Sequence, residues 1–322
     1  MNYSLLNFFV SILLAGSIFF SFSSKSLFFI WVCLEINMLM YVSMEKNYSS
    51  FMSVSVMKYY IIQGLSSMIF LFFILYSHTV GMVQDQFVSF FIFLSMWIKL
   101  GFYPFSGWYF VITENMSWVM WFLLNTFQKL IPLWVLSFNL FKMDMVMCLL
   151  IINMIYISIE MWNQVSLRWV VNCSSLNHFS WMVVSMNSHL SSWELYFFIY
   201  FLINFILMVF MKEYNWMSFL SMFLYKSCFS VMIFMLIFFN FVGIPPFLGF
   251  LGKLLVLKLS MSNYILLLLM FNTVIVCVVY LQVLMSSLNI LMMFKFDIFN
   301  ISLLLILLSL SIIMLFMIPF IL

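Results

Sequence analysis

Four charged residues fall inside long apolar segments of the chain. Glu35 is the midpoint of the apolar run 26–44, about 13 Å from either end if the run is helical. Lys99, Lys129 and Lys253 lie within three further apolar runs. If such runs cross a bilayer, each central charge costs at least about 2.5–3.5 kcal/mol, and residues of this kind mark ion or proton pathways.

Buried lysines near a carboxylate are suited to proton exchange. Burial disfavours the ammonium form of a lysine, whereas a nearby carboxylate favours it. A row of such groups, joined by Asn, Gln, Ser, His and water, forms a path for protons. We therefore predict that Glu35, Lys99, Lys129 and Lys253 translocate protons. The sequence leaves open whether they line up.

Structural interpretations of the same residues remain open. Glu35 can be a neutral acid that is hydrogen-bonded to Asn37 or to a neighbouring helix. Lys99 can extend its ammonium group toward the membrane surface. For Lys129, the polar neighbours Asn125 and Gln128 on its own helical face favour the functional interpretation.

Two further residues are candidates for a proton relay, and both also have structural interpretations. Lys58 can reach the membrane surface past the tyrosines that follow it. His178 is near the middle of an apolar run, where Ser174 and Ser175 can satisfy it as a packed polar residue. The chain has no set of residues at the spacing of zinc ligands, so we predict no metal site. It also has no Gly-rich phosphate loop.

The composition indicates what kind of fold positions these residues. The chain has 322 residues, of which 67% are hydrophobic and 7% charged, against about 45–50% and 25% in soluble domains. These values exclude a soluble enzyme, a nucleic-acid-binding protein and a disordered chain. The apolar runs are continuous rather than alternating, which argues against a β-barrel. The prediction is an all-α polytopic membrane protein.

The apolar runs predict the number of membrane spans. A transmembrane helix needs about 20 apolar residues, and we expect eleven such helices. They cover residues 5–23, 26–44, 52–77, 87–112, 117–139, 143–160, 165–188, 193–211, 228–257, 263–288 and 301–321.

A repeated motif predicts how these spans are organised. The pattern G-x-x-P-F-x-G occurs at residues 101–107 and again at 243–249, five spans later, so the two copies run in opposite directions. We therefore expect two inverted five-helix repeats, each with one broken helix. Broken helices at matching positions of two inverted halves mark transport sites in membrane proteins. The alternative is two ordinary proline kinks. The repeats would cover residues 1–140 and 141–290, followed by a C-terminal helix in 291–322, with helix breaks at Gly101, Pro104, Gly243, Pro245 and Pro246.

Six passages between residues 31 and 255 resemble the subunit 2 family of mitochondrial NADH:ubiquinone oxidoreductase, respiratory complex I. They are residues 31–37, 57–63, 99–108, 127–133, 163–181 and 243–253. The resemblance implies a shortened antiporter-type subunit. The family's proton-handling glutamate and lysines fall on Glu35, Lys99, Lys129 and Lys253.

The resemblance also implies a function. The chain would be a proton-translocation module of the enzyme, coupled to NADH oxidation and ubiquinone reduction in other subunits, and would itself bind no cofactor. It would lie in the mitochondrial inner membrane beside the antiporter-like subunit 4, the small subunit 4L, accessory subunits and lipids, without nucleic acid. A stand-alone cation/proton antiporter and a membrane scaffold remain alternatives.

Two positions depart from the family pattern. The family usually has a basic residue where this chain has Trp169, and a histidine where it has Ser106. A proton-relay role for that histidine is therefore not expected in this chain.

Overall fold

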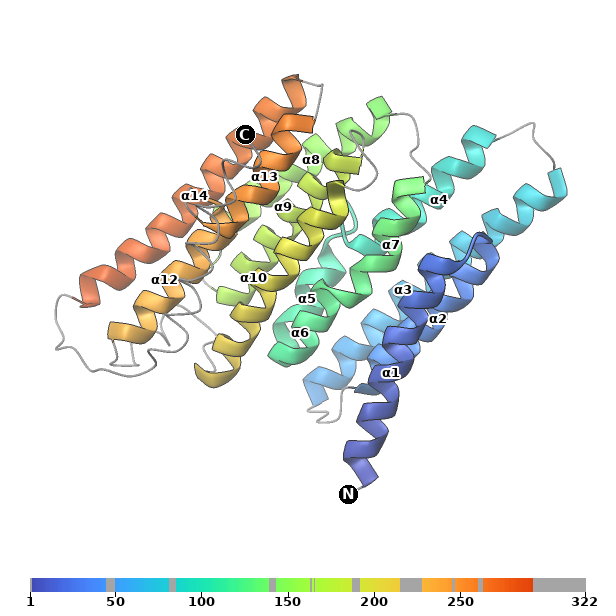
Figure 1. Ribbon diagram of the computed structural model, residues 1–322, viewed down its shortest axis with the longest axis horizontal. Helices are drawn as coiled ribbons and strands as arrows, with labels where there is room; N and C mark the ends of the chain where they lie inside the picture. Colours follow the sequence, from blue (N-terminus) through green and yellow to red (C-terminus); the bar gives the residue numbers. More distant parts are fainter. Residues whose placement is uncertain are drawn as a thin grey trace. The chain divides into compact units, whose positions relative to one another are not determined.

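The chain is helical in a computed structural model, as the composition predicted (Figure 1). The structure describes residues 2–44, 50–80, 85–138, 143–162, 164, 166–186, 192–214, 228–244, 247–259 and 263–291. The predicted span 301–321 and the prolines Pro245 and Pro246 lie outside these residues. The all-α fold class is confirmed for the part of the chain that is described.

The chain divides into two compact units, Met1–Val146 and Met147–Leu322. In the first unit, three long helices pack in sequence, α1 on α2 and α2 on α3, and α4 contacts both α3 and α7. Its helices are α1 (Asn2–Ser23), α2 (Leu27–Met44), α3 (Ser50–Val80), α4 (Asp85–Leu100), α5 (Gly107–Asn115), α6 (Trp118–Asn125) and α7 (Phe127–Phe138).

The second unit is built around a buried helix. Every residue of α9 except Trp169 is buried, and α9 contacts α10 and α13. Asn153 of α8 donates a side-chain hydrogen bond to Ser180 of α9 at 3.1 Å. The helices of this unit are α8 (Met143–Trp162), α9 (Leu167–Met186), α10 (Ser192–Tyr214), α12 (Cys228–Val242), α13 (Leu248–Leu259) and α14 (Asn263–Leu291).

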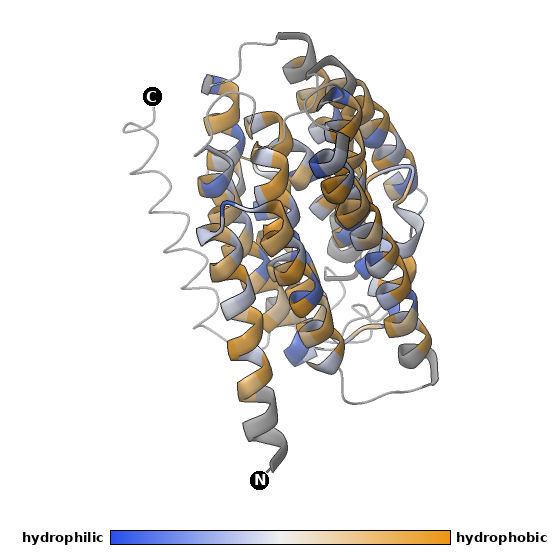
Figure 2. Ribbon diagram, turned by 90° about the vertical axis from the view of Figure 1, so that its right-hand side faces the viewer, coloured by the Kyte–Doolittle hydropathy of each residue, from blue (hydrophilic) through white to orange (hydrophobic). Residues whose placement is uncertain are grey.

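Large apolar side chains lie on the outward faces of these helices. Phe19 of α1 is 75% exposed and Phe198 of α10 is 61% exposed, and Figure 2 shows hydrophobic residues along most of each helix. Lipid solvates such faces, whereas water does not. Four helical segments of the described chain are long and apolar enough to cross a membrane: Leu27–Met44, Val54–Thr79, Trp118–Phe138 and Ser192–Tyr214. Five further apolar helices are shorter.

The predicted span 117–139 has an interruption that the sequence did not reveal. Thr126 separates α6 from α7, with φ −114° and ψ −80°. Its hydroxyl donates to the carbonyl of Phe122 at 2.7 Å, and side-chain bonds of this kind bend helices. The interruption sets the direction of α7, which carries Lys129.

Candidate proton-handling sites

A glycine ends α4 and creates the first helix break. Gly101 has φ +71°, a conformation that other residues adopt only with strain. Its N–H donates to the carbonyl of Ile98 at 3.0 Å, and the N–H of Phe102 donates to the carbonyl of Trp97 at 3.4 Å. These bonds resemble a Schellman cap, which satisfies some of the carbonyls at a helix end and leaves others free.

Two indole groups hold the first break together. Trp108 Nε1 donates to the carbonyl of Ile98 at 3.2 Å, and Trp97 Nε1 donates to the carbonyl of Tyr103 at 2.9 Å. The side chains of α4 and α5 therefore bind the backbone that the break exposes. The chain can leave and re-enter the helix here without an unsatisfied carbonyl at either position.

Lys129 binds a carbonyl at the end of α4. Its ammonium nitrogen lies 2.6 Å from the carbonyl oxygen of Leu100 and 3.4 Å from that of Lys99. The same nitrogen lies 5.4 Å from the ring centre of Trp108 and 4.7 Å from that of Tyr109. A helix C-terminus and aromatic faces both attract a cation, so these contacts offset part of the cost of burying the ammonium group.

Lys99 lies in the last turn of α4, immediately before the break at Gly101, and is buried rather than extended toward the surface. Its charge interacts electrostatically with that of Glu35 on α2. The Glu35 carboxylate is half-buried and accepts a hydrogen bond from the Ser67 hydroxyl on α3. The first unit therefore brings three of the predicted residues, Glu35, Lys99 and Lys129, to one region around the end of α4.

A chain of polar side chains links α3, α7 and α2 beside this region. The Tyr59 hydroxyl donates to Gln128 Oε1 at 2.9 Å, and Gln128 Nε2 donates to Asn37 Oδ1 at 3.1 Å. Tyr59 and Asn37 are both buried. Gln128 precedes Lys129, so the chain fixes the start of the helix that carries the lysine.

Replacing Gln128 with leucine is expected to lower stability by about 1–3 kcal/mol, because it removes a hydrogen-bonding partner from buried polar groups on both sides. Thermal unfolding in detergent would measure the change. The double variant with Tyr59→Phe should cost less than the two single changes summed, because the tyrosine hydroxyl has then been removed as well. Strict additivity would show that the hydrogen bond contributes nothing, and exposed Gln86→Leu serves as the control.

The second break shares two backbone features with the first, a glycine with positive φ and a bond from the next N–H to the carbonyl five residues earlier. Gly243 has φ +68°, and the N–H of Ile244 donates to the carbonyl of Phe239 at 3.5 Å. After the break, Leu248 N–H donates to Asn240 Oδ1 at 3.2 Å, which joins the start of α13 to α12. Among the described residues, both units therefore contain a helix that ends immediately before a glycine, α4 before Gly101 and α12 before Gly243.

Lys253 binds the end of α12. Its ammonium nitrogen lies 2.6 Å from the carbonyl oxygen of Val242 and 5.9 Å from the ring centre of Trp181. His178 Nε2 lies 3.0 Å from the neighbouring carbonyl oxygen of Phe241, and His178 Nδ1 lies 2.9 Å from the Tyr196 hydroxyl. The second unit therefore gathers two of the predicted residues, Lys253 and His178, at one helix end.

The two lysine sites correspond to each other through the carbonyls that they bind. Lys129 binds the residue immediately before Gly101, and Lys253 binds the residue immediately before Gly243. The lysines come from different elements, because Lys129 lies on the next span and Lys253 on the second half of its own broken helix. The repeated motif at residues 101–107 and 243–249 includes neither lysine, so it did not reveal this correspondence.

The remaining candidate, Lys58, is exposed on α3. Several groups that shape the two sites were not predicted, notably the Ser67 hydroxyl, the Tyr196 hydroxyl and the rings beneath the lysines. No local signal identifies them, because serine, tyrosine and tryptophan are frequent throughout the chain.

Comparisons with known proteins identify the family of the chain. A model of the family described as "NADH:quinone oxidoreductase/Mrp antiporter, TM" matches residues 24–279. The chain belongs to this family, and together with its apolar helices this makes it a multi-pass membrane protein.

Within the family, the chain is similar to proteins named NADH-ubiquinone oxidoreductase chain 2. The one from Anopheles gambiae is 33% identical over 78% of this chain and 76% of its own length. The one from Locusta migratoria is 31% identical over 85% of this chain and 82% of its own length. The family resemblance predicted from the sequence is thereby confirmed.

Solved structures share the fold. A chain of respiratory complex I from Thermus thermophilus matches with a TM-score of 0.80 at 14% identity, covering 97% of this chain and 77% of that chain. A chain of the membrane-bound sulfane sulfur reductase, an archaeal respiratory membrane complex, matches with a TM-score of 0.78 at 13% identity, covering 96% of this chain and 71% of that chain.

Proposed function

We propose that this chain is a membrane-arm subunit of respiratory complex I that translocates protons. The observation that carries the proposal is the matched pair of buried lysines, each 2.6 Å from a carbonyl at a helix break. The names of the similar chains support membership of NADH-ubiquinone oxidoreductase. NADH oxidation and ubiquinone reduction would take place in other subunits, with no NADH, flavin, iron–sulfur cluster or quinone bound by this chain.

In this proposal, the protonation of each lysine is coupled to its helix break. A protonated lysine donates to the carbonyl and adds a positive charge at the negative end of the helix dipole. A lysine that has released its proton keeps two N–H groups but loses the charge, so the attraction weakens. Glu35 would bias this exchange through its interaction with Lys99, and His178 would act as a relay beside Lys253.

The proposed architecture has eleven spans in two inverted five-helix repeats. The recurrence of a positive-φ glycine at 101 and 243, each followed by an N–H that bonds the carbonyl five residues earlier, supports it. The membrane would be the mitochondrial inner membrane, as the names of the relatives suggest. The antiporter-like subunit 4, the small subunit 4L, accessory subunits and lipids would be the neighbours, and Lys58 would be at most an additional relay.

The assembly claim predicts how the chain migrates after mild solubilisation of the source membranes. On a blue-native gel, mass spectrometry should find the chain in the band that oxidises NADH. A chain that runs alone or as a small oligomer would contradict the proposal. In that case, the purified chain should be tested in vesicles for cation/proton exchange without NADH, which is the activity expected of a stand-alone antiporter.

A further inference from the structure

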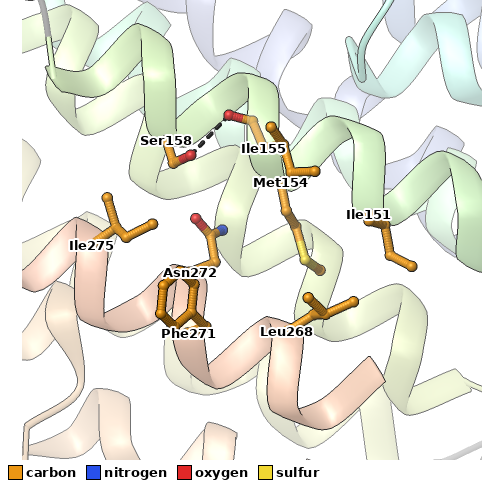
Figure 3. Close-up of a pocket in the computed structure, with 8 residues that line it drawn as sticks. All are labelled: Ile151, Met154, Ile155, Ser158, Leu268, Phe271, Asn272 and Ile275. Atoms are coloured by element: carbon orange, nitrogen blue, oxygen red, sulfur yellow. Dashed lines mark hydrogen bonds between the residues drawn. The ribbon is translucent and has the colours of Figure 1, made fainter. Parts of the chain in front are cut away.

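An apolar groove runs between α8 and α14 in the second unit (Figure 3). It encloses about 220 Å³ and is lined by Ile151, Met154, Ile155, Ser158, Leu268, Phe271, Asn272 and Ile275. A second hollow of about 370 Å³ continues it toward Trp162, sharing Ser158 and Ile275. From Ile151 to Trp162 the groove follows α8 for about 16 Å, or three helical turns.

One polar atom in this groove has no partner among the described residues. Asn272 is 95% buried, and its Nδ2 donates to Asn177 Oδ1 at 3.1 Å. Its Oδ1 is buried without a hydrogen bond and points into the space between Ser158 and Ile275 (Figure 3). The Ser158 hydroxyl donates to the carbonyl of Ile155 at 2.8 Å, so toward the groove it offers only an acceptor. The groove therefore needs a hydrogen-bond donor.

The depth of this acceptor selects the kind of occupant. Asn272 lies nine residues into α14, about 14 Å along its axis. That places the acceptor near the middle of a hydrocarbon core of about 30 Å if α14 begins at its boundary. Lipid acyl chains carry no donor at this depth. A transmembrane helix can present serine, threonine, asparagine or lysine there, and such groups bond helices together in membranes.

We propose that the α8–α14 groove is a docking site for a transmembrane helix of another subunit, which donates a hydrogen bond to Asn272 Oδ1 at mid-membrane depth. Ile155 of α8 and Ile275 of α14 both line the groove, and they would have to move aside for a donor to reach this buried atom. The apolar lining would pack against the body of the incoming helix. This inference rests on the proposed membership of a multi-subunit complex, but not on the proton-handling roles of the lysines.

A density map of the intact complex, purified with its lipids, tests the proposal directly. The expected result is a helix of another chain along α8 and α14, with a side-chain donor within hydrogen-bonding distance of Asn272 Oδ1. A lipid acyl chain in the groove, water alone on Asn272, or a helix with only apolar side chains at that level would each overturn it. If the chain is not in a complex at all, the proposed function has failed rather than this inference alone.

A matched pair of variants provides a second test in the assembled complex. Ile155→Trp fills the groove, whereas Ile152→Trp places the same ring on the same helix outside its lining. Both isoleucines are about half-exposed, so neither change overpacks the core. Ile155→Trp should reduce the assembled complex on native gels at least tenfold, with Ile152→Trp close to the unmodified chain. Equal assembly of the two variants would overturn the proposal.

Discussion

Replacing Lys129 with methionine should reduce NADH-driven proton pumping by about tenfold or more, because the proposed proton-transfer group is lost. The ammonium group lies 2.6 Å from the carbonyl of Leu100, over the ring of Tyr109, in a site that is almost fully buried. Methionine fills much of the same volume without a charge or donor. Pumping by the complex in vesicles, relative to NADH oxidation, is the measurement.

An arginine variant separates the two roles of Lys129. Arginine keeps the charge and can bind the carbonyls at the end of α4, but it does not release its proton under physiological conditions. Lys129→Arg should therefore assemble better than Lys129→Met while pumping equally poorly. Lys25→Met, at an exposed position between α1 and α2, is the control for loss of charge. Normal pumping by Lys129→Met would show that Lys129 only caps the end of α4 and does not transfer protons.

Gly249→Ala should disrupt the second unit more than any other single methyl addition at a described glycine. A Cβ there would lie 1.9 Å from the carbonyl oxygen of Asn240 and 3.2 Å from the Cα of Gly243. Both are backbone atoms, so α12 and α13 would have to separate. We expect a loss of about 3 kcal/mol or more, as for severe overpacking. Thermal unfolding and the amount of assembled complex would report it.

Gly64→Ala is the matched control for this change. It adds the same methyl group inside helix α3, where nothing lies within 4 Å of the new Cβ. Alanine is a better helix former than glycine, so stability should stay equal or rise slightly. If both alanine variants unfold at the same temperature, the close approach of α12 and α13 at Gly249 does not hold the break together.

The sequence predicted the helical class and the position of Lys99 for physical reasons that act locally. Long apolar runs must be helical in a membrane, because their backbone groups need internal partners. A glycine after an apolar helix marks its end, and Lys99 falls in the turn before Gly101. These features depend on neighbours within a few residues, so a single sequence contains enough information to find them.

The contacts of the buried lysines could not be predicted in the same way. Lys129 and the carbonyl that it binds are 29 residues apart and lie on helices α7 and α4. Their meeting depends on how those helices pack and on the interruption at Thr126. The Ser67–Glu35 bond likewise joins separate helices. Pairings of this kind follow from tertiary packing, which composition and motif spacing do not encode.

The acceptor at each break is a backbone atom, which makes it insensitive to mutation. Any amino acid at position 100 or 242 supplies the same carbonyl oxygen to Lys129 or Lys253. A backbone carbonyl also has no proton to exchange at any physiological pH, unlike a carboxylate. A substitution at Leu100 or Val242 changes a buried side chain but leaves the acceptor atom in place. In the proposed mechanism, the protonation of the lysine is the variable that changes at the contact. A mutational scan can remove the lysine side chains that donate these bonds, but it cannot remove the backbone carbonyls that accept them.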